Sequence, residues 1–389
     1  MKSVDESGGA ILVLLDLSAA FDTIDHDKLL NLLNTSFGVQ GAALDWIKSY
    51  LSDRKQSVLI NGKTSDELNL SWGVPQGSVL GPILFTVYTT PLASIIRKHG
   101  IDFHLYADDT QLYIAFKPSC PTSKSDGITK LEGCIGDIRK WMSENMLKLN
   151  EDKTEVLVIT SREQIGDICI NVGGCDIFPG SDPPKNLGVL FDSSCSLNQH
   201  VNKLCKALNY SIFNIGKIRK YLDTSTAEIL VNSLVTSKMD YCNSLLYGIN
   251  EYQLDRIQRC QNSAARVISL SRKHDHITPT LHSLHWLPVR YRIIYKMLVI
   301  AHKSLYDEGP VYLRNLLAWY TPERELRSGN QYRLYEPTWR LKSFGARRFE
   351  YAAPRLWNTM LPLELRKERN TEHFKSGLKT CLFKLAYPC

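Results

Sequence analysis

The stretch "FHLYADDTQLYIAF" at residues 103–116 limits the possible fold more than any other part of this sequence, because two adjacent aspartates lie between runs of aromatic and aliphatic residues. These runs predict two strands joined by a tight turn that carries Asp108 and Asp109. Two like charges at one turn raise the energy of a fold unless a cation neutralises them. That cation is either a solvated lysine or a metal ion, and the rest of the sequence bears on the choice.

A third aspartate lies at the end of another apolar run. "AILVLLDLSAAF" (10–21) predicts a central strand that is buried on both faces, with Asp16 near its end. If the two strands are neighbours, Asp16 and Asp108 face the same point, and converging carboxylates bind hard cations such as Mg²⁺. Two such ions, about 3.5–4 Å apart, activate an attacking hydroxyl and stabilise a leaving phosphate. An Asp-Asp pair alone is more often a polar turn, and the third aspartate weakens that alternative.

The first 192 residues have the pattern of an α+β unit. Helical spacing of Leu, Trp and Ile occurs in "DHDKLLNLLNTSFG" and "AALDWIKSYLSDR". Further along, the sequence predicts a hairpin at 55–78 around Asn61-Gly62, an uncharged helix at 78–96, a helix at 128–146, a strand at 153–160 and short strands within 167–192. The uncharged helix contains Gly81-Pro82 and Pro91, which favour a buried helix over a membrane span.

The pattern changes after residue 192. Long helical stretches predict a helical domain over residues 193–270, and residues 271–389 form a basic region rich in Trp, Tyr and Arg. The charge is divided unevenly, since residues 1–196 carry 17 Lys and Arg against 25 Asp and Glu, whereas residues 261–389 carry 22 against 10. This division suits a protein that gathers cations in one part and polyanions in another, although unevenly charged surfaces are common.

Basic and aromatic residues alternate in the last region. Arg290, Arg292, Arg347, Arg348 and Arg355 are interleaved with Trp286, Tyr291, Phe349 and Trp357. Such a mixture suits contact with a phosphate backbone and stacking on bases. Arginine stems that cover a helical core explain the same residues equally well. The histidine-rich stretch "HDHITPTLHSLHW" has no convincing cysteine partner nearby, so a zinc site there is disfavoured.

Five motifs in a fixed order carry a resemblance to a known family. They are "LLDLSAAFDTIDH", "GVPQGSVLGPILF", "LYADDTQLY", "LKLNEDKTEVLVI" and "KNLGVLFD". In this order the chain resembles the reverse transcriptase of non-LTR (LINE-type) retrotransposons. The resemblance implies a right-hand polymerase palm, with an antiparallel sheet packed on helices, over residues 1–192. A helical thumb at 193–270 and a basic, mostly helical C-terminal region at 271–389 would follow.

The resemblance also implies the catalytic residues and a cofactor. Asp16, Asp108 and Asp109 match the family's catalytic carboxylates, and the main-chain carbonyl of Leu17 completes the metal shell. The cofactor implied is a pair of Mg²⁺ ions, which Mn²⁺ can replace. Lys153 matches a lysine that donates a proton to the leaving pyrophosphate, although a single surface lysine is usually only solvated.

Substrate contacts are implied in the same way. Phe21 matches the bulky gate that excludes a ribose 2′-hydroxyl by steric clash, and without Asp16 in register it would be an ordinary core aromatic. The loop before the uncharged helix matches a contact to the incoming nucleotide or template through Pro75, Gln76 and Gly77, and it also reads as a turn with Ser78 as the helix N-cap. Leu187 and Gly188 match the segment that grips the primer terminus, or they form a simple turn.

The implied function is RNA-directed DNA polymerisation, the transfer of nucleotides from dNTPs to a primer 3′-hydroxyl on an RNA template. Its partners would be an RNA template, a DNA primer or target and dNTPs, in the cytoplasm and nucleus and without a membrane. The family's upstream fingers and endonuclease are expected to be missing, so the alternative is an inactive relic that only binds nucleic acid. Group II intron maturases and telomerase share the carboxylate pattern and remain as related alternatives.

Overall fold

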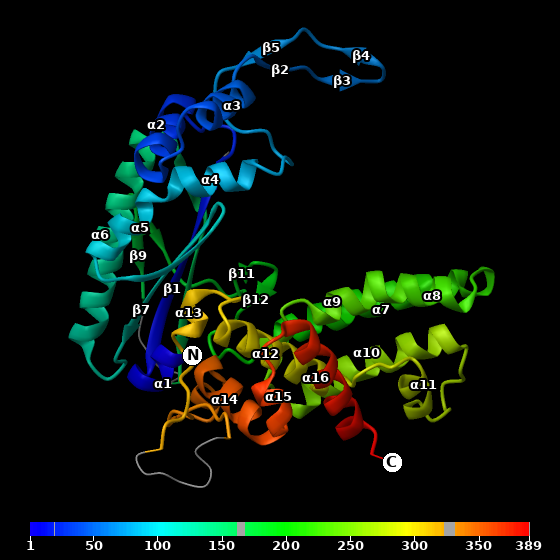
Figure 1. Ribbon diagram of the computed structural model, residues 1–389. Coiled ribbons are helices and arrows are strands. Elements are labelled where there is room, and N and C mark those ends of the chain that lie inside the picture. Colours follow the sequence, from blue (N-terminus) through cyan, green and yellow to red (C-terminus); the bar gives the residue numbers. More distant parts are fainter. Residues whose placement is uncertain (19, 162–167, 323–330, 389) are drawn as a thin grey trace. The chain divides into compact units, whose positions relative to one another are not determined.

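The computed structural model describes residues 1–18, 20–161, 168–322 and 331–388 (Figure 1). The chain divides into two compact units. One consists of Ser7–Pro184, and the other combines Met1–Glu6 with Lys185–Cys389. We call them the sheet unit and the helical unit. The finer division at residues 192 and 270 stays a prediction.

A four-stranded antiparallel sheet forms the centre of the sheet unit. Its strand order is β6-β7-β1-β8, so β1 lies between β7 and β8. The bounds of the strands are Gly9–Ser18 for β1, Asp102–Tyr106 for β6, Asp109–Phe116 for β7 and Lys148–Thr160 for β8. The predicted hairpin at 103–116, the central strand and the strand at 153–160 are therefore confirmed, and β8 begins five residues before its predicted start.

One face of the sheet carries the core, and the other face is more open. Along β1 the residues alternate: Ile11, Val13, Leu15 and Leu17 are buried, whereas Leu12, Leu14 and Asp16 are only half-buried. The prediction that this strand is buried on both faces is wrong. Side chains alternate between the faces of a strand, so this pattern places Asp16 on the face away from the core.

Helices cover the core face of the sheet (Figure 1). They contribute Phe85, Leu92, Leu131 and Ile138 to the same buried cluster as the strands. The helices of this unit are α2 (His26–Phe37), α3 (Ala42–Leu51), α4 (Gly81–Thr89), α5 (Pro91–Lys98) and α6 (Pro121–Glu144).

The uncharged stretch forms two helices, so the single helix predicted at 78–96 is wrong in its extent. The break falls at Pro91, which opens α5 because proline has no N–H to donate within a helix. Among the residues that the structure describes, no helix combines the length and the apolar character needed to cross a membrane.

A long hairpin extends from this unit beyond α3 (Figure 1). Its strands are β2 (Arg54–Gln56), β3 (Leu59–Ile60), β4 (Lys63–Thr64) and β5 (Leu68–Leu70). Asn61 and Gly62 form its turn with φ of 50° and 78°. Positive φ at both turn positions is typical of a type I′ turn, so the hairpin predicted around Asn61-Gly62 is confirmed. A shorter hairpin pairs β9 (Ile170–Val172) with β10 (Cys175–Ile177).

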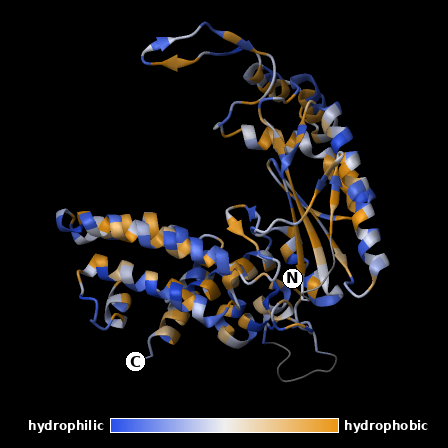
Figure 2. Ribbon diagram, turned by 180° about the vertical axis from the view of Figure 1, so that it is seen from behind, coloured by the Kyte–Doolittle hydropathy of each residue, from blue (hydrophilic) through white to orange (hydrophobic). Residues whose placement is uncertain are grey.

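The helical unit contains two hydrophobic clusters and one small hairpin. Hydrophobic and hydrophilic residues lie side by side along its helices (Figure 2), as amphipathic packing requires. The first cluster is built on α7 and α10, and the second on α12, α14 and α16 around Trp357 and Phe374. The main elements are α1 (Lys2–Ser7), which begins in this unit, β11 (Lys185–Asn186), β12 (Val189–Leu190), α7 (Asn198–Ile218), α8 (Thr224–Val231), α9 (Ser237–Asp240), α10 (Glu251–Ser269), α11 (Thr278–Ser283), α12 (Val289–Leu305), α13 (Val311–Arg314), α14 (Phe349–Met360), α15 (Leu363–Lys367) and α16 (Thr371–Ala386). Short non-α turns are η1 (Arg219–Tyr221), η2 (Asn232–Thr236), η3 (Asn243–Leu246) and η4 (Gly345–Arg347).

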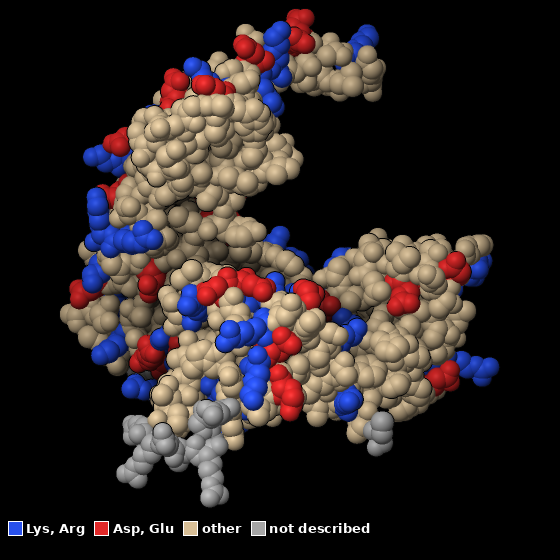
Figure 3. Space-filling model, in the orientation of Figure 1, with Lys and Arg blue, Asp and Glu red and all other residues tan. Residues whose placement is uncertain are grey.

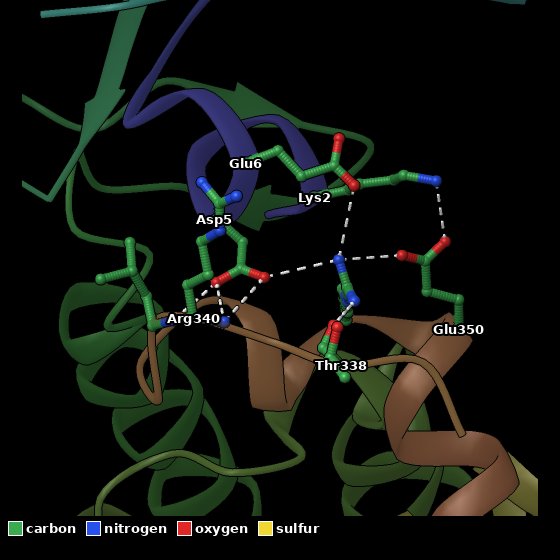
Figure 4. A network of polar contacts seen from close by, with 8 residues as sticks. Lys2, Asp5, Glu6, Thr338, Arg340 and Glu350 are labelled. Carbon is green, nitrogen blue, oxygen red and sulfur yellow. Dashed lines mark hydrogen bonds and ion pairs between the residues drawn. The ribbon is translucent and has the colours of Figure 1, made fainter.

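A buried charge network ties the first residues of the chain to this unit (Figure 4). The Arg348 side chain is 6% exposed, and its guanidinium lies 3.4 Å from Asp5 and 3.0 Å from Glu350. The Asp5 side chain is 2% exposed and also accepts backbone N–H bonds from Arg340 and Leu341, at 3.0 Å and 2.6 Å. Charges this deeply buried are stable only when they are paired and hydrogen-bonded.

The arginines of the basic region are partly structural. Arg347 donates to the backbone carbonyls of Tyr247 and Cys195, at 3.1 Å and 2.7 Å, and Arg292 pairs with Asp240 at 2.8 Å. Together with Arg348, three of the five arginines therefore make contacts within the helical unit, as the structural alternative leads one to expect. On the face of the helical unit seen in Figure 3, acidic and basic side chains are intermixed.

We expect Arg348→Met to lower the free energy of unfolding by about 3–5 kcal/mol, because it leaves the buried Asp5 carboxylate unpaired. Chemical denaturation with far-UV circular dichroism measures the change. Lys342→Met is the control, since Lys342 is exposed and should change stability by no more than about 0.5 kcal/mol. A loss below about 1 kcal/mol for Arg348→Met would show that the network is not needed.

Candidate active site

The register of the sheet brings two of the predicted carboxylates together. Leu15 on β1 pairs with Thr110 on β7, so one further step along both strands sets Asp16 opposite Asp109. Directly opposed residues of antiparallel strands project from the same face with Cβ atoms about 5 Å apart. The sequence predicts that Asp16 and Asp108 face the same point, which stays a prediction, and the strand register brings Asp109 to the same strand ends.

Asp108 lies in the tight turn that precedes Asp109. Tyr106 on β6 pairs with Asp109 on β7, which leaves Ala107 and Asp108 as the two turn residues. Ala107 has a φ of 52°, in the left-handed region that residues other than glycine seldom occupy. Backbone strain of this kind costs about 1–3 kcal/mol and is concentrated at functional sites. The tight turn holds two carboxylates at the end of the hairpin.

A bulge in β8 brings a lysine to Asp16. Leu14 pairs with Glu155 and Asp16 with Asn150, so β8 has more residues than β1 over this interval. Lys153 lies within the bulge, and its Nζ atom is 3.6 Å from Asp16 Oδ2. The Lys153 side chain is 68% exposed, so its hold on Asp16 is partly screened by water. A bulge at the end of a strand redirects a side chain in this way.

The electrostatics at this sheet edge favour a cation. Asp16 Oδ2 is buried and accepts no hydrogen bond from the described residues. Burial raises the pKa of Asp109 above its usual value, and the negative charges of Asp108 and then Asp16 raise this pKa further. The three carboxylates therefore repel one another as the protein stands, and a cation placed among them would remove that repulsion.

The donor atoms suit magnesium in their chemistry. Carboxylate oxygens with a backbone carbonyl, such as that of Leu17, are the hard oxygen ligands that Mg²⁺ takes, and Asp16 offers a buried oxygen that accepts no hydrogen bond from the described residues. Within the described ranges, however, no three His, Cys, Asp or Glu side chains are already grouped around one metal position. A metal would thus bind by drawing these carboxylates inward.

Phe21 and the loop that follows residue 72 are held against each other by main-chain contacts. Val74 N–H donates to Phe21 O, and Gly73 N–H donates to Ile24 O, each at 2.8 Å. Gly73 has a φ of 85°, and a Cβ there would lie 2.8 Å from the backbone oxygen of Asp22, so only glycine fits. The Phe21 ring is partly buried and packs on Phe85 with ring centroids 4.8 Å apart.

The residues predicted to contact nucleotide lie in this loop. Gln76 Nε2 donates to Asp22 Oδ1 at 3.0 Å, and Pro75 and Gly77 lie on either side of Gln76. Asp22 is therefore a neighbour of the site that the sequence reasoning missed, as is Asn150 opposite Asp16. Leu80 occupies the N-cap position of α4, yet the hydroxyl oxygen of Ser78 accepts from Gly81 N–H at 3.0 Å, so Ser78 makes the predicted capping hydrogen bond from two residues further upstream.

The predicted primer-grip residues lie in the helical unit. Leu187 and Gly188 form the turn between β11 and β12, with φ of 44° and 86°. The Tyr241 hydroxyl donates to Leu187 O at 2.7 Å and fixes this turn. Within the helical unit, Leu187 and Gly188 therefore form a turn, as the simple-turn alternative predicted.

A family model described as reverse transcriptase (RNA-dependent DNA polymerase) matches residues 2–191. Among curated proteins, the chain is 26% identical over 276 residues to a probable RNA-directed DNA polymerase from transposon X-element of Drosophila melanogaster, covering 66% of this chain and 28% of that protein. It is also 26% identical over 282 residues to the RNA-directed DNA polymerase from mobile element jockey of Drosophila funebris, covering 69% and 29%.

The chain thus spans less than a third of the length of these relatives. Among solved structures, a telomerase from Candida tropicalis with a fragment of telomeric RNA is 12% identical, covering 74% of this chain and 47% of that one. The TM-score is 0.35, which is too low to support an argument about the fold.

We expect Asp109→Asn to stabilise the metal-free protein at pH 7, because it removes a carboxylate whose pKa the fold raises. A raised pKa means that the carboxylate favours folding only while it is protonated, at low pH, and that this contribution is lost as the pH rises through the folded-state pKa. The gain of the variant should therefore be present at pH 7 and vanish near pH 3.

Thermal unfolding in a chelator measures this gain, which should be no more than about 1 kcal/mol, because Asp109 is only partly buried and water screens the repulsion. Asp66→Asn, at an exposed position beside β4, is the control and should leave stability unchanged at both pH values. If Asp109→Asn is as stable as the wild type or less stable at pH 7, the carboxylates do not repel one another.

Proposed function

We propose that this chain, which residues 2–191 place among the reverse transcriptases of non-LTR retrotransposons, is an RNA-directed DNA polymerase that transfers nucleotides from dNTPs to a primer 3′-hydroxyl on an RNA template. The observation that carries this proposal is the strand register that sets Asp16 opposite Asp109, next to Asp108 in the tight turn. The three-part division into palm, thumb and basic C-terminal region belongs to the same proposal.

Asp16, Asp108 and Asp109, with the main-chain carbonyl of Leu17, would hold two divalent ions, Mg²⁺ or in its place Mn²⁺. When bound, such ions activate the attacking hydroxyl and stabilise the charge on the leaving pyrophosphate. The buried Oδ2 of Asp16, which accepts no hydrogen bond from the described residues, and the raised pKa of Asp109 support this assignment, because both features become favourable beside a cation. Asp16 brings its carboxylate from β1, and the tight turn brings the other two.

Lys153 would change partner during the reaction. In the metal-free protein its ammonium lies 3.6 Å from Asp16 Oδ2 and partly neutralises that carboxylate. A metal ion on Asp16 would replace this contact, and the long exposed side chain could then turn toward the leaving pyrophosphate. There it would serve as proton donor.

Phe21 would select deoxynucleotides by the bulk of its ring, which Phe85 supports from the core side. The loop of Pro75, Gln76 and Gly77 would contact the incoming nucleotide or template, with Gln76 oriented by Asp22. The turn of Leu187 and Gly188 would contact the primer terminus. The proposed partners are an RNA template, a DNA primer or target and dNTPs, and the proposed compartments are the cytoplasm and the nucleus.

Primer extension on an RNA template tests this proposal. We expect the chain to extend a DNA primer with dNTPs in Mg²⁺, and we expect Asp108→Asn to slow extension at least about 10²–10³-fold, because it removes a charge that stabilises the transition state. Asp126→Asn, on the exposed side of α6, is the matched control and should extend at the wild-type rate. Extension by Asp108→Asn at that rate, or none by the wild type, would contradict the proposal.

A further inference from the structure

A cavity of about 450 Å³ lies within the helical unit, among α8, α9, α12, α16 and the segment before α12. Its volume falls in the range of roughly 300–1,000 Å³ that is typical of small-molecule sites. None of the residues proposed above for catalysis lines it. Some of the residues that line it are acidic or hydrogen-bonding, and others are basic, so different parts of a ligand would contact each group.

One wall is a row of hydrogen-bonding side chains on a single helical path. Glu228, Asn232, Thr236 and Asp240 occur every four residues along α8, η2 and α9, and all four line the cavity. The segment η2 is a turn of π-helix, a feature that is frequent at functional sites. This wall presents carboxylate, amide and hydroxyl groups to the cavity.

The cavity also contains a buried acceptor without a donor. Asn243 is 4% exposed and lines the cavity, and its Oδ1 atom has no hydrogen-bond partner among the described residues. Its Nδ2 atom donates to Asp240 Oδ1 at 3.2 Å. Because a carboxylate can only accept, the amide nitrogen must face Asp240, and the oxygen is necessarily the atom left over. An unpaired buried acceptor is costly, so a ligand N–H group would complete this site.

The facing wall is cationic. Lys296 on α12 and Lys379 on α16 line the cavity, and neither forms an ion pair with any described residue. Arg292 is fixed by Asp240 at 2.8 Å and lies over the Trp286 ring at 5.7 Å. The two lysines are therefore the cations left to bind an anion, while the planar Arg292 group offers a surface on which an aromatic ring can stack.

We propose that this cavity binds one nucleotide, with its base at the wall of Asn243 and its phosphate between Lys296 and Lys379. A base supplies the N–H donor that Asn243 Oδ1 lacks, and a phosphate supplies the charge that the two lysines lack. An acidic peptide without aromatic side chains would satisfy the lysines, but it has no flat ring for the Arg292 plane. The nucleotide is free, or it is an unpaired residue of RNA or DNA. This site is independent of the carboxylates of the sheet unit.

Calorimetric titration of the full chain tests the proposal. The ligands are the four ribonucleoside 5′-monophosphates, deoxyadenosine 5′-monophosphate, five-residue RNA and DNA strands, and ribose 5-phosphate. We expect Lys296→Ala and Lys379→Ala each to weaken nucleotide binding about tenfold, the loss expected for a charge-assisted hydrogen bond. Lys384→Ala, on the same helix as Lys379, exposed and outside the cavity lining, is the matched control and should leave affinity unchanged.

The ligand series separates the parts of the proposal. Tighter binding of nucleotides than of ribose 5-phosphate supports recognition of the base, and equal binding would overturn it. Tighter binding of the five-residue strands than of monophosphates identifies an unpaired residue of a nucleic acid as the ligand, and the reverse order identifies a free nucleotide. An equal effect of all three lysine variants, or no binding by the wild type, would overturn the proposal. Thermal unfolding of each variant shows whether it is folded.

Discussion

Repulsion among three carboxylates at one end of the central sheet is the constraint on which the candidate active site depends. The register between β1 and β7 sets Asp16 opposite Asp109 and leaves Asp108 in the adjoining turn. A fold that only had to be stable would not gather these charges, since the charges of Asp108 and Asp16 add to the burial that raises the pKa of Asp109. The arrangement becomes favourable when a cation joins it. The bulge of β8, which carries Lys153 to Asp16, partly neutralises the site in the meantime.

In the helical unit, the buried charge of Arg348 lies next to charges of opposite sign rather than of the same sign. Around Arg348, the guanidinium pairs with Asp5 and Glu350, and backbone N–H groups donate to Asp5, so the network holds the first residues of the chain in place. At Asn243, by contrast, the Oδ1 atom accepts no hydrogen bond from any described residue. A buried acceptor that lacks a donor is costly, and a ligand that supplies the donor would remove this cost.

Local patterns predicted much of the fold. The apolar run before Asp16, the alternating strands around Asp108 and the turn at Asn61-Gly62 all depend on neighbours in the sequence, and the structure contains each of them. Pro91 is a residue typical of helix starts, but the residues on both sides of it are uncharged. The sequence therefore predicted one continuous helix where the structure has α4 and α5.

What the sequence could not predict depends on contacts between distant residues. That Asp109 joins Asp16 at the same strand ends follows from the register of two strands about ninety residues apart. The pairing that directs Lys153 to Asp16 likewise joins β1 to β8. Arginine alone does not reveal whether it is buried, so the ion pair of Arg348 with Asp5 could not be distinguished from a surface that binds nucleic acid.

The central claim is that the carboxylates at this sheet edge form a site for divalent ions. Electron paramagnetic resonance of Mn²⁺ titrated into the chain tests it without requiring turnover. We expect bound Mn²⁺ that Mg²⁺ displaces, and we expect Asp16→Ala to lose most of this binding, because it removes the one carboxylate that β1 contributes. Mn²⁺ binding of the same stoichiometry and affinity in Asp16→Ala as in the wild type would contradict the claim.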